Sequence, residues 1–201
     1  MRGFFVVVEG NDGAGKSTFL HRLEKEFREE GIDALFTREP GGADVAEKIR
    51  SLLLDPDHAM GARTEALLYA AARADHVEKT IRPALDAGKL VLCDRYVLSS
   101  LAYQGYGRGL AIEEVRALSR FATEGLTPDL TLFFALDPEE SVRRKKGELD
   151  RMERSGREFF RRVNEGYWAL AGSAVAIDAA RSPEVVYNEA KGILMDRLRE
   201  G

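Results

Sequence analysis

The sequence has only one cysteine, Cys93, among its 201 residues, so no disulfide can form within the chain. A fold without disulfides is typical of a reducing compartment. Long apolar runs are also missing, since stretches such as Phe4–Val8 and Ala66–Ala72 fall far short of the roughly 20 residues that span a bilayer. Glu9 ends the first run too early for a secretory signal peptide. We therefore expect a cytoplasmic protein with no cleaved segment and no membrane partner.

An excess of positive charge is the next missing feature, because 30 Lys and Arg stand against 34 Asp and Glu, a net charge of −4. This balance argues against a general nucleic-acid-binding protein. The basic residues are nevertheless concentrated between Arg143 and Arg162, where nine basic side chains meet four acidic ones. A local cationic patch on an acidic chain suits a compact polyanion such as a nucleotide. A solvated helix with ion pairs between successive turns remains the alternative.

Internal repeats, low-complexity stretches and a Pro- or Ser-rich linker are absent as well. With 44% hydrophobic residues the chain can bury a core of its own. We therefore expect one domain over residues 1–201.

Short β-branched and aromatic runs alternate with helical patterns along the whole chain. This alternation predicts an α/β fold with a parallel five-stranded sheet flanked by helices on both faces. The predicted strands are Phe4–Val8, Ile32–Phe36, Leu90–Cys93, Leu130–Leu136 and Val175–Ile177. The predicted helices cover 16–30, 45–53, 64–87 with a bend near Pro83, and 112–121, and two more begin near Asp137 and Ser182.

The segment Gly10–Ser17 fits the pattern G-x-x-x-x-G-K-[ST] at every fixed position. It follows a predicted buried strand and opens a predicted helix, which is the context that a phosphate-binding loop requires. Backbone N–H groups of such a loop converge on a phosphate at the helix N-terminus. Lys16 would bridge the β- and γ-phosphates, and Ser17 would ligate Mg²⁺. The segment predicts a P-loop NTPase fold that binds ATP and Mg²⁺, although an ordinary Gly-rich turn is the simpler alternative.

Asp94 ends the third predicted strand and matches the second carboxylate that organises Mg²⁺ in P-loop proteins. A helix N-cap is its alternative role, and the two roles can coexist.

No N-K-x-D segment for guanine recognition is present, and motor or transporter ATPases are usually larger. These observations favour a small kinase.

Two arginines follow neighbouring strands of the predicted sheet. Arg38 lies in the loop Thr37–Gly42, and Arg95 follows Asp94 directly. Guanidinium groups bind phosphate bidentately, so the pair could hold a second phosphate group beside the first. A surface or ion-pair role is the alternative for either arginine alone.

Several motifs in one order resemble the thymidylate kinase family, and the resemblance covers essentially the full chain. The matching segments are Glu9–Thr18, Thr37–Gly42, Glu65–Arg73, Asp94–Tyr96 with Ser99, Ala102–Gly105, and Glu148–Arg151. The resemblance implies an enzyme that transfers the γ-phosphate of ATP to dTMP in dTTP synthesis. It also implies Mg²⁺ as cofactor and a homodimer.

The resemblance assigns the binding roles residue by residue. It places the deoxyribose 3′-hydroxyl on Asp12 and the base edge on Arg73 and Gln104. Tyr69 stands where an aromatic residue, more commonly Phe, stacks on thymine; without the resemblance it would be taken as core. Tyr103 would crowd the 2′ position. The implied substrate site is Asp12, Arg38, Tyr69, Arg73, Arg95, Ser99, Ser100, Tyr103 and Gln104, and the implied ATP site is Gly10, Asn11, Asp12, Gly13, Ala14, Gly15, Lys16, Ser17, Thr18, Arg143 and Arg151.

The basic segment resembles the lid of bacterial-type members, in which lid arginines serve the transferring phosphate. Some relatives carry a basic residue within the phosphate loop, where this chain has Gly13. The lid would cover about 143–156, with Arg151 as first choice for the reacting phosphate and Arg143 and Arg154 behind it. The implied catalytic residues are Lys16, Asp94, Arg95 and Arg151. No role is assigned to Asn164, where relatives often have a basic residue.

Two alternative functions stay open at this point. The first is a kinase of the same architecture that acts on another nucleoside monophosphate or on a deoxynucleoside. The second is a binding module that uses the phosphate loop as a nucleotide switch, although a switch has no need of a second phosphate pocket at Arg38 and Arg95.

Overall fold

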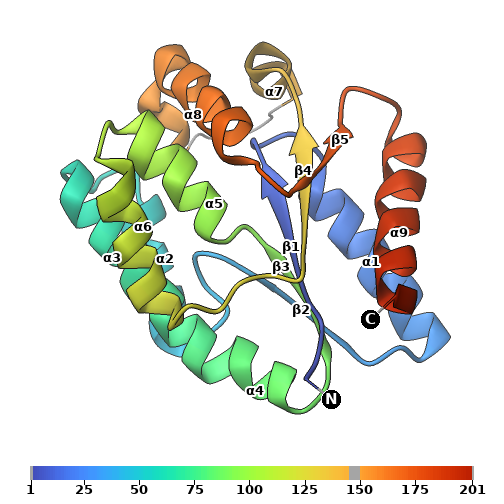
Figure 1. Cartoon of the computed structure of the whole chain (residues 1–201). Coiled ribbons are helices and arrows are strands. Elements are labelled where there is room, and N and C mark those ends of the chain that lie inside the picture. The colour runs from blue at the N-terminus through green and yellow to red at the C-terminus, as the bar shows by residue number, and fades with distance from the viewer. Residues whose placement is uncertain (1, 145–149, 201) are drawn as a thin grey trace.

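Five parallel strands form one sheet in the order β2-β3-β1-β4-β5 (Figure 1). The computed structural model describes residues 2–144 and 150–200. The sheet confirms the predicted α/β class and the predicted parallel arrangement. Its strands are β1 (Phe5–Gly10), β2 (Ala34–Arg38), β3 (Leu90–Asp94), β4 (Leu130–Ala135) and β5 (Val175–Asp178).

Helices cover both faces of the sheet (Figure 1). The α-helices are α1 (Lys16–Glu30), α2 (Asp44–Leu54), α3 (Ala62–His76), α4 (Arg82–Asp86), α5 (Val97–Ser100), α6 (Ile112–Thr123), α7 (Pro138–Arg144), α8 (Arg157–Leu170) and α9 (Pro183–Glu200). Two π-helical segments, η1 (Val77–Ile81) and η2 (Leu101–Gly107), and a 3₁₀ turn, η3 (Glu153–Ser155), complete the described elements.

The central strand β1 is buried along its whole length, and its alternating side chains enter two different cores. Val6 and Val8 pack in a cluster with residues of α1 and α9. Phe5 and Val7 pack on the other face with residues of η1 and α4. Burial on both faces explains why this strand is apolar without alternation.

The predicted helix over 64–87 is a continuous run from α3 through η1 to α4. The bend expected near Pro83 takes the form of a π-helical turn, in which the N–H of Arg82 donates to the carbonyl of Val77. Proline cannot donate a hydrogen bond to the preceding turn, and a wider turn beside it accommodates the loss.

Two helical regions go beyond the predicted elements. Residues 97–107 form α5 and η2, and α8 follows the lid segment. Strand β2 also begins two residues later than predicted, at Ala34, so that Arg38 lies at its carboxyl end.

The carboxyl ends of β1, β2 and β3 meet at one edge of the sheet. Arg38 is the register partner of Asp94, and Asp94 is also the partner of Val8. Ligands of open parallel sheets bind at this edge. Of the predicted lid over 143–156, residues 145–149 lie outside the described residues.

Candidate active site

The phosphate loop has the backbone that its glycines predict. Gly10, Gly13 and Gly15 all have positive φ angles, of 134°, 75° and 89°. A Cβ atom at Gly10 would lie 2.3 Å from the carbonyl oxygen of Phe134. Only glycine therefore fits at this position, where the chain turns from β1 toward α1.

Lys16, the first residue of α1, folds back over the loop that precedes it. Its Nζ donates to the carbonyl oxygens of Gly10 at 2.9 Å and Asn11 at 3.0 Å. Burial lowers the pKa of Lys16 to about 8. The ammonium is thus poorly solvated and available to an anion that enters the loop.

The hydroxyl of Ser17 donates to Oδ2 of Asp94 at 3.1 Å. The other carboxylate oxygen of Asp94, Oδ1, is buried and accepts no hydrogen bond from the part of the chain that the structure describes. Mg²⁺ prefers hard oxygen ligands and is usually held by one or two protein groups together with water and phosphates. The hydroxyl of Ser17 and the unpartnered oxygen of Asp94 fit such an ion.

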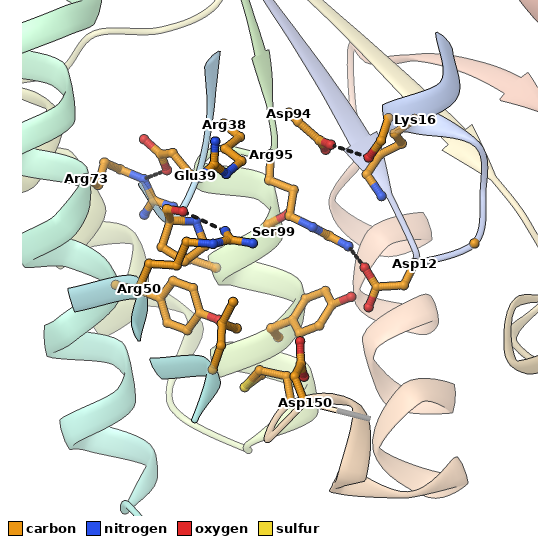
Figure 2. A pocket seen from close by; sticks show the side chains of 18 of the residues that line it. Asp12, Lys16, Arg38, Glu39, Arg50, Arg73, Asp94, Arg95, Ser99 and Asp150 are labelled. Atoms are coloured by element: carbon orange, nitrogen blue, oxygen red, sulfur yellow. Dashed lines mark hydrogen bonds and ion pairs between the residues drawn. The ribbon is translucent and has the colours of Figure 1, made fainter. Parts of the chain in front are cut away.

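Arg95 connects the phosphate loop with the neighbouring end of the cleft. Its NH1 donates to the hydroxyls of Ser99 at 3.2 Å and Tyr167 at 3.0 Å. Its NH2 forms an ion pair with Asp12 of the phosphate loop (Figure 2). Arg95 also has a positive φ of 70°, unusual for a residue with a Cβ. Contacts on three sides hold the guanidinium in one orientation.

Glu9 is a fully buried carboxylate beside Ser99, and the sequence assigns it no separate role. It accepts hydrogen bonds from the N–H groups of Tyr96 at 2.8 Å and Ser99 at 3.2 Å, and from the hydroxyl of Ser99 at 2.5 Å. Burial raises the pKa of Glu9. Glu9 therefore supports Ser99, which in turn contacts Arg95.

The second predicted phosphate ligand, Arg38, lies at the same end of the cleft and forms an ion pair with Glu47 at 3.0 Å. Beside it lies Arg50, whose NH1 donates to the carbonyl of Pro40 at 2.7 Å (Figure 2). Burial lowers the pKa of Arg50. Sequence reasoning missed Arg50, because the helical spacing around it marks only the apolar face of α2.

At the far end of the cleft, Arg73 and Gln104 each donate a hydrogen bond to a buried carboxylate. Arg73 donates from Nε to Oε2 of Glu39 at 2.6 Å and from NH2 to the carbonyl of Tyr96 at 3.0 Å. Gln104 donates from Nε2 to Oε1 of Glu65 at 3.0 Å. The two predicted base-reading residues are therefore held by Glu39 and Glu65, to which the sequence analysis assigned no role.

These groups surround one cleft of about 510 Å³, and only some of them line it. The predicted site residues that line it are Asp12, Gly13, Gly15, Lys16, Ser17, Thr18, Arg38, Tyr69, Arg73, Asp94, Arg95, Ser99, Ser100, Tyr103 and Gln104. Gly10, Asn11 and Ala14 belong to the loop without lining the cleft. The structure thus brings the residues predicted to bind ATP and those predicted to bind dTMP together, while their individual roles remain predictions.

The lid arginines are placed differently from the other predicted residues. Arg151 donates from NH1 to Glu65 and from Nε to the carbonyl of Leu53, both at 2.7 Å, and does not line the cleft. Arg143 is exposed and pairs with Glu140 at 3.3 Å, whereas its neighbour Arg144 lines the cleft.

Arg154 lies in the short turn η3, where its N–H donates to the carbonyl of Asp150 at 3.1 Å. Which arginine meets the transferring phosphate remains a prediction.

A family model described as thymidylate kinase matches residues 8–190. The chain belongs to the thymidylate kinase family. The thymidylate kinase of Finegoldia magna is 49% identical over 199 residues, which cover 96% of this chain and 98% of the relative. That of an Exiguobacterium species is 46% identical over 208 residues, covering 100% of this chain and 98% of the relative.

A solved structure agrees with the family. The crystal structure of thymidylate kinase from Ehrlichia chaffeensis matches with a TM-score of 0.77 at 30% identity, covering 96% of this chain and 99% of that chain. The enzyme therefore phosphorylates dTMP to dTDP with ATP as phosphate donor. The family decides against the alternative of a nucleotide-gated binding module. Among residues 2–144 and 150–200, no helix combines the length and apolar character needed to cross a bilayer.

Proposed function

We propose that the cleft holds ATP and dTMP end to end, so that the γ-phosphate passes directly to the dTMP phosphate. One observation carries this arrangement: Arg95, which follows β3, pairs with Asp12 of the phosphate loop. This contact supports a position of the acceptor phosphate, which Arg95 would bind, beside the phosphate loop. A donor phosphate in the loop and an acceptor phosphate on Arg95 would then face each other across a short gap.

The transfer requires charge neutralisation rather than a general base. An oxygen of the dTMP phosphate attacks the γ-phosphorus, and the bond from that phosphorus to the bridging oxygen breaks, releasing ADP. The second pKa of a phosphate monoester near 6 leaves the attacking group mostly dianionic at pH 7. Lys16, Arg38 and Arg95 would offset the repulsion between the two polyanions. Mg²⁺ held at Ser17 and Asp94 would polarise the donor phosphates.

We assign recognition of the base to Arg73 and Gln104, with Tyr69 stacked on the ring. Arg73 uses Nε and NH2 on protein acceptors, and its NH1 donates to no acceptor among the described residues. That donor would suit a carbonyl oxygen of the base. Tyr103, whose buried hydroxyl lacks a hydrogen-bond partner in the described chain, would lie at the sugar with Asp12 and favour deoxyribose.

We propose that residues 1–201 act as one nucleoside monophosphate kinase domain with a lid at about 143–156. Closure of the lid would exclude water, which would otherwise hydrolyse ATP. Arg151 would then contribute to the transferring phosphate, with Arg143 and Arg154 as the next candidates.

We further propose a cytoplasmic homodimer formed through α2, α3 and α6. Helix α3 packs against both neighbours. All three helices carry large apolar side chains that are exposed on the isolated chain, namely Val45, Leu52, Leu67 and Phe121. A second copy of the chain would cover them. Sedimentation analysis of the wild type and of Phe121→Asp tests this assembly, with a monomeric wild type as the contrary result.

A panel of phosphate acceptors tests the proposed roles. With ATP and Mg²⁺, the enzyme is expected to favour dTMP clearly over dCMP, UMP and thymidine. Arg73→Ala should raise the KM for dTMP while the KM for ATP stays near its wild-type value. A wild-type preference for dCMP, UMP or thymidine would overturn the substrate assignment.

A further inference from the structure

Glu65 is a fully buried carboxylate of α3 that no predicted role explains. Its Oε1 accepts hydrogen bonds from Gln104 Nε2 at 3.0 Å and Arg108 Nε at 3.1 Å. Its Oε2 accepts one from Arg151 NH1 at 2.7 Å. Burial by itself raises the pKa of Glu65, but the hydrogen bonds from Arg108, Gln104 and Arg151 outweigh burial and lower it. Glu65 is therefore ionised over the whole working range of pH.

An ionised carboxylate can only accept hydrogen bonds. The amide of Gln104 must therefore turn its NH₂ group toward Glu65, because the opposite orientation would set two acceptor oxygens against each other. The orientation follows from the charge of Glu65 and needs no ligand. The carbonyl oxygen of Gln104 accepts no hydrogen bond from residues 2–144 or 150–200, and Gln104 lines the cleft. The carbonyl oxygen of Gln104 is thus a hydrogen-bond acceptor with a fixed orientation at the end of the cleft where the base is proposed to bind.

We propose that Glu65 is a positioning residue that selects thymine over cytosine by holding the Gln104 carbonyl oxygen toward the ring N3 of the base. Thymine carries a hydrogen on N3 and donates it, whereas N3 of cytosine is an acceptor. A dCMP molecule in the same place would put two acceptors face to face. The inference rests on the proposed placement of the base at Arg73 and Gln104, and it deepens that proposal by explaining how the amide is kept from rotating.

Arg73 is also held by protein groups that leave one of its atoms for the base. Glu39 and the carbonyl of Tyr96 bind two of its nitrogens, so that a donor remains for the cleft. A donor at this position matches the O4 oxygen of thymine and opposes the amino group of cytosine. Two buried carboxylates, Glu39 and Glu65, thereby fix one donor and one acceptor. A base that mismatches such a buried pattern is rejected far more strongly than one that merely differs in size.

The variant Glu65→Gln tests the inference, because a neutral amide can donate as well as accept and so releases Gln104 to rotate. We expect the ratio of kcat/KM for dTMP to kcat/KM for dCMP to fall about tenfold or more. The loss should arise mainly from a higher KM for dTMP, with the KM for ATP unchanged. Glu65→Asp, which keeps the charge, should restore part of the ratio.

Arg108→Gln is the matched control. It removes another donor from Glu65 without touching Gln104, so the dTMP to dCMP ratio should stay near its wild-type value. Thermal unfolding of each variant separates a loss of stability from a loss of selectivity. A wild-type ratio in Glu65→Gln overturns the inference, and so does an equal loss of selectivity in Arg108→Gln.

A measurement on the unaltered enzyme covers the case in which Glu65→Gln fails to fold. In ¹⁵N spectra of the wild type, assigned with Gln104→Asn, one side-chain NH₂ proton of Gln104 should exchange slowly with solvent. Rapid exchange of both protons overturns the inference. This readout uses no substrate, so that failure of dTMP turnover in the wild type would refute the proposed function and leave the orientation of Gln104 to be decided separately.

Discussion

The two ends of the cleft are built in different ways. The proposed donor end is one continuous loop, residues 10–18, whose glycines permit its shape. The acceptor end is assembled from β2, α3, β3 and η2, and its functional groups are side chains. Arg73, Gln104 and Arg95 each bind a carboxylate, Glu39, Glu65 and Asp12 respectively.

This difference shows two ways to make a site specific. Backbone N–H groups recognise any phosphate of suitable geometry, which is adequate for a donor nucleotide held by its phosphates. Recognition of one base requires hydrogen-bond donors and acceptors that cannot exchange places when a side chain rotates. In the proposal above, Glu65 provides that constraint for the amide of Gln104, whereas the guanidinium of Arg73 can only donate.

The largest expected effect lies at the donor end. Replacing Lys16 by Ala should lower kcat by about 10² to 10³, because a preorganised cation at the developing charge is lost. Lys25→Ala, a substitution of an exposed lysine on the same helix, serves as control in steady-state assays. Near wild-type turnover in Lys16→Ala would refute the role of this lysine.

The second largest effect is expected at the lid, where it shows whether Arg151 acts on the transferring phosphate or on dTMP binding. Arg151→Ala should lower kcat by about 10² and raise the KM for dTMP less. Arg161→Ala, which removes an exposed arginine of α8, should leave both constants unchanged. A change confined to the KM for dTMP would instead connect Arg151 with the acceptor end, where it contacts Glu65 in this structure.

A third effect follows from the pKa of Lys16, which burial lowers to about 8. Only the protonated lysine attracts ATP, and its fraction falls as pH rises through that value. Between pH 7 and pH 9 the apparent Kd for ATP should therefore rise about tenfold. Calorimetric titration measures it. Lys16→Arg stays protonated and should lack this step, so a step that persists in the variant belongs to another group.

The smallest expected effect is at the hydroxyl of Tyr69. Tyr69→Phe keeps the ring face, so the KM for dTMP should change by about threefold or less. Burial raises the pKa of this hydroxyl, which therefore stays neutral at working pH. A tenfold change in KM would mean that the hydroxyl itself binds the substrate.

The backbone of the donor end followed from one local pattern, whereas at the acceptor end only Arg38 and Arg95 followed from the residues and the other side chains from resemblance. Gly10–Ser17 is one local pattern between a strand and a helix, and its backbone has the predicted turns. Glu39 and Glu65 lie within matched segments but received no role, because a carboxylate that becomes buried looks the same in sequence as one on the surface. The apolar residues of α2 and α6 show the converse, since Val45 and Phe121 fit helical spacing and yet are exposed.

The turns of the strand–loop–helix unit around Lys16 follow from its own residues, because its glycines have positive φ angles and Lys16 donates to the carbonyl oxygens of Gly10 and Asn11. Tertiary structure alone decided the partners of Arg73, Gln104 and Arg151, which lie between 34 and 86 residues away along the chain. The physical reason is that the polarity of a buried site depends on which charges the fold removes from water together, and that pairing exists only once the helices have packed against the sheet.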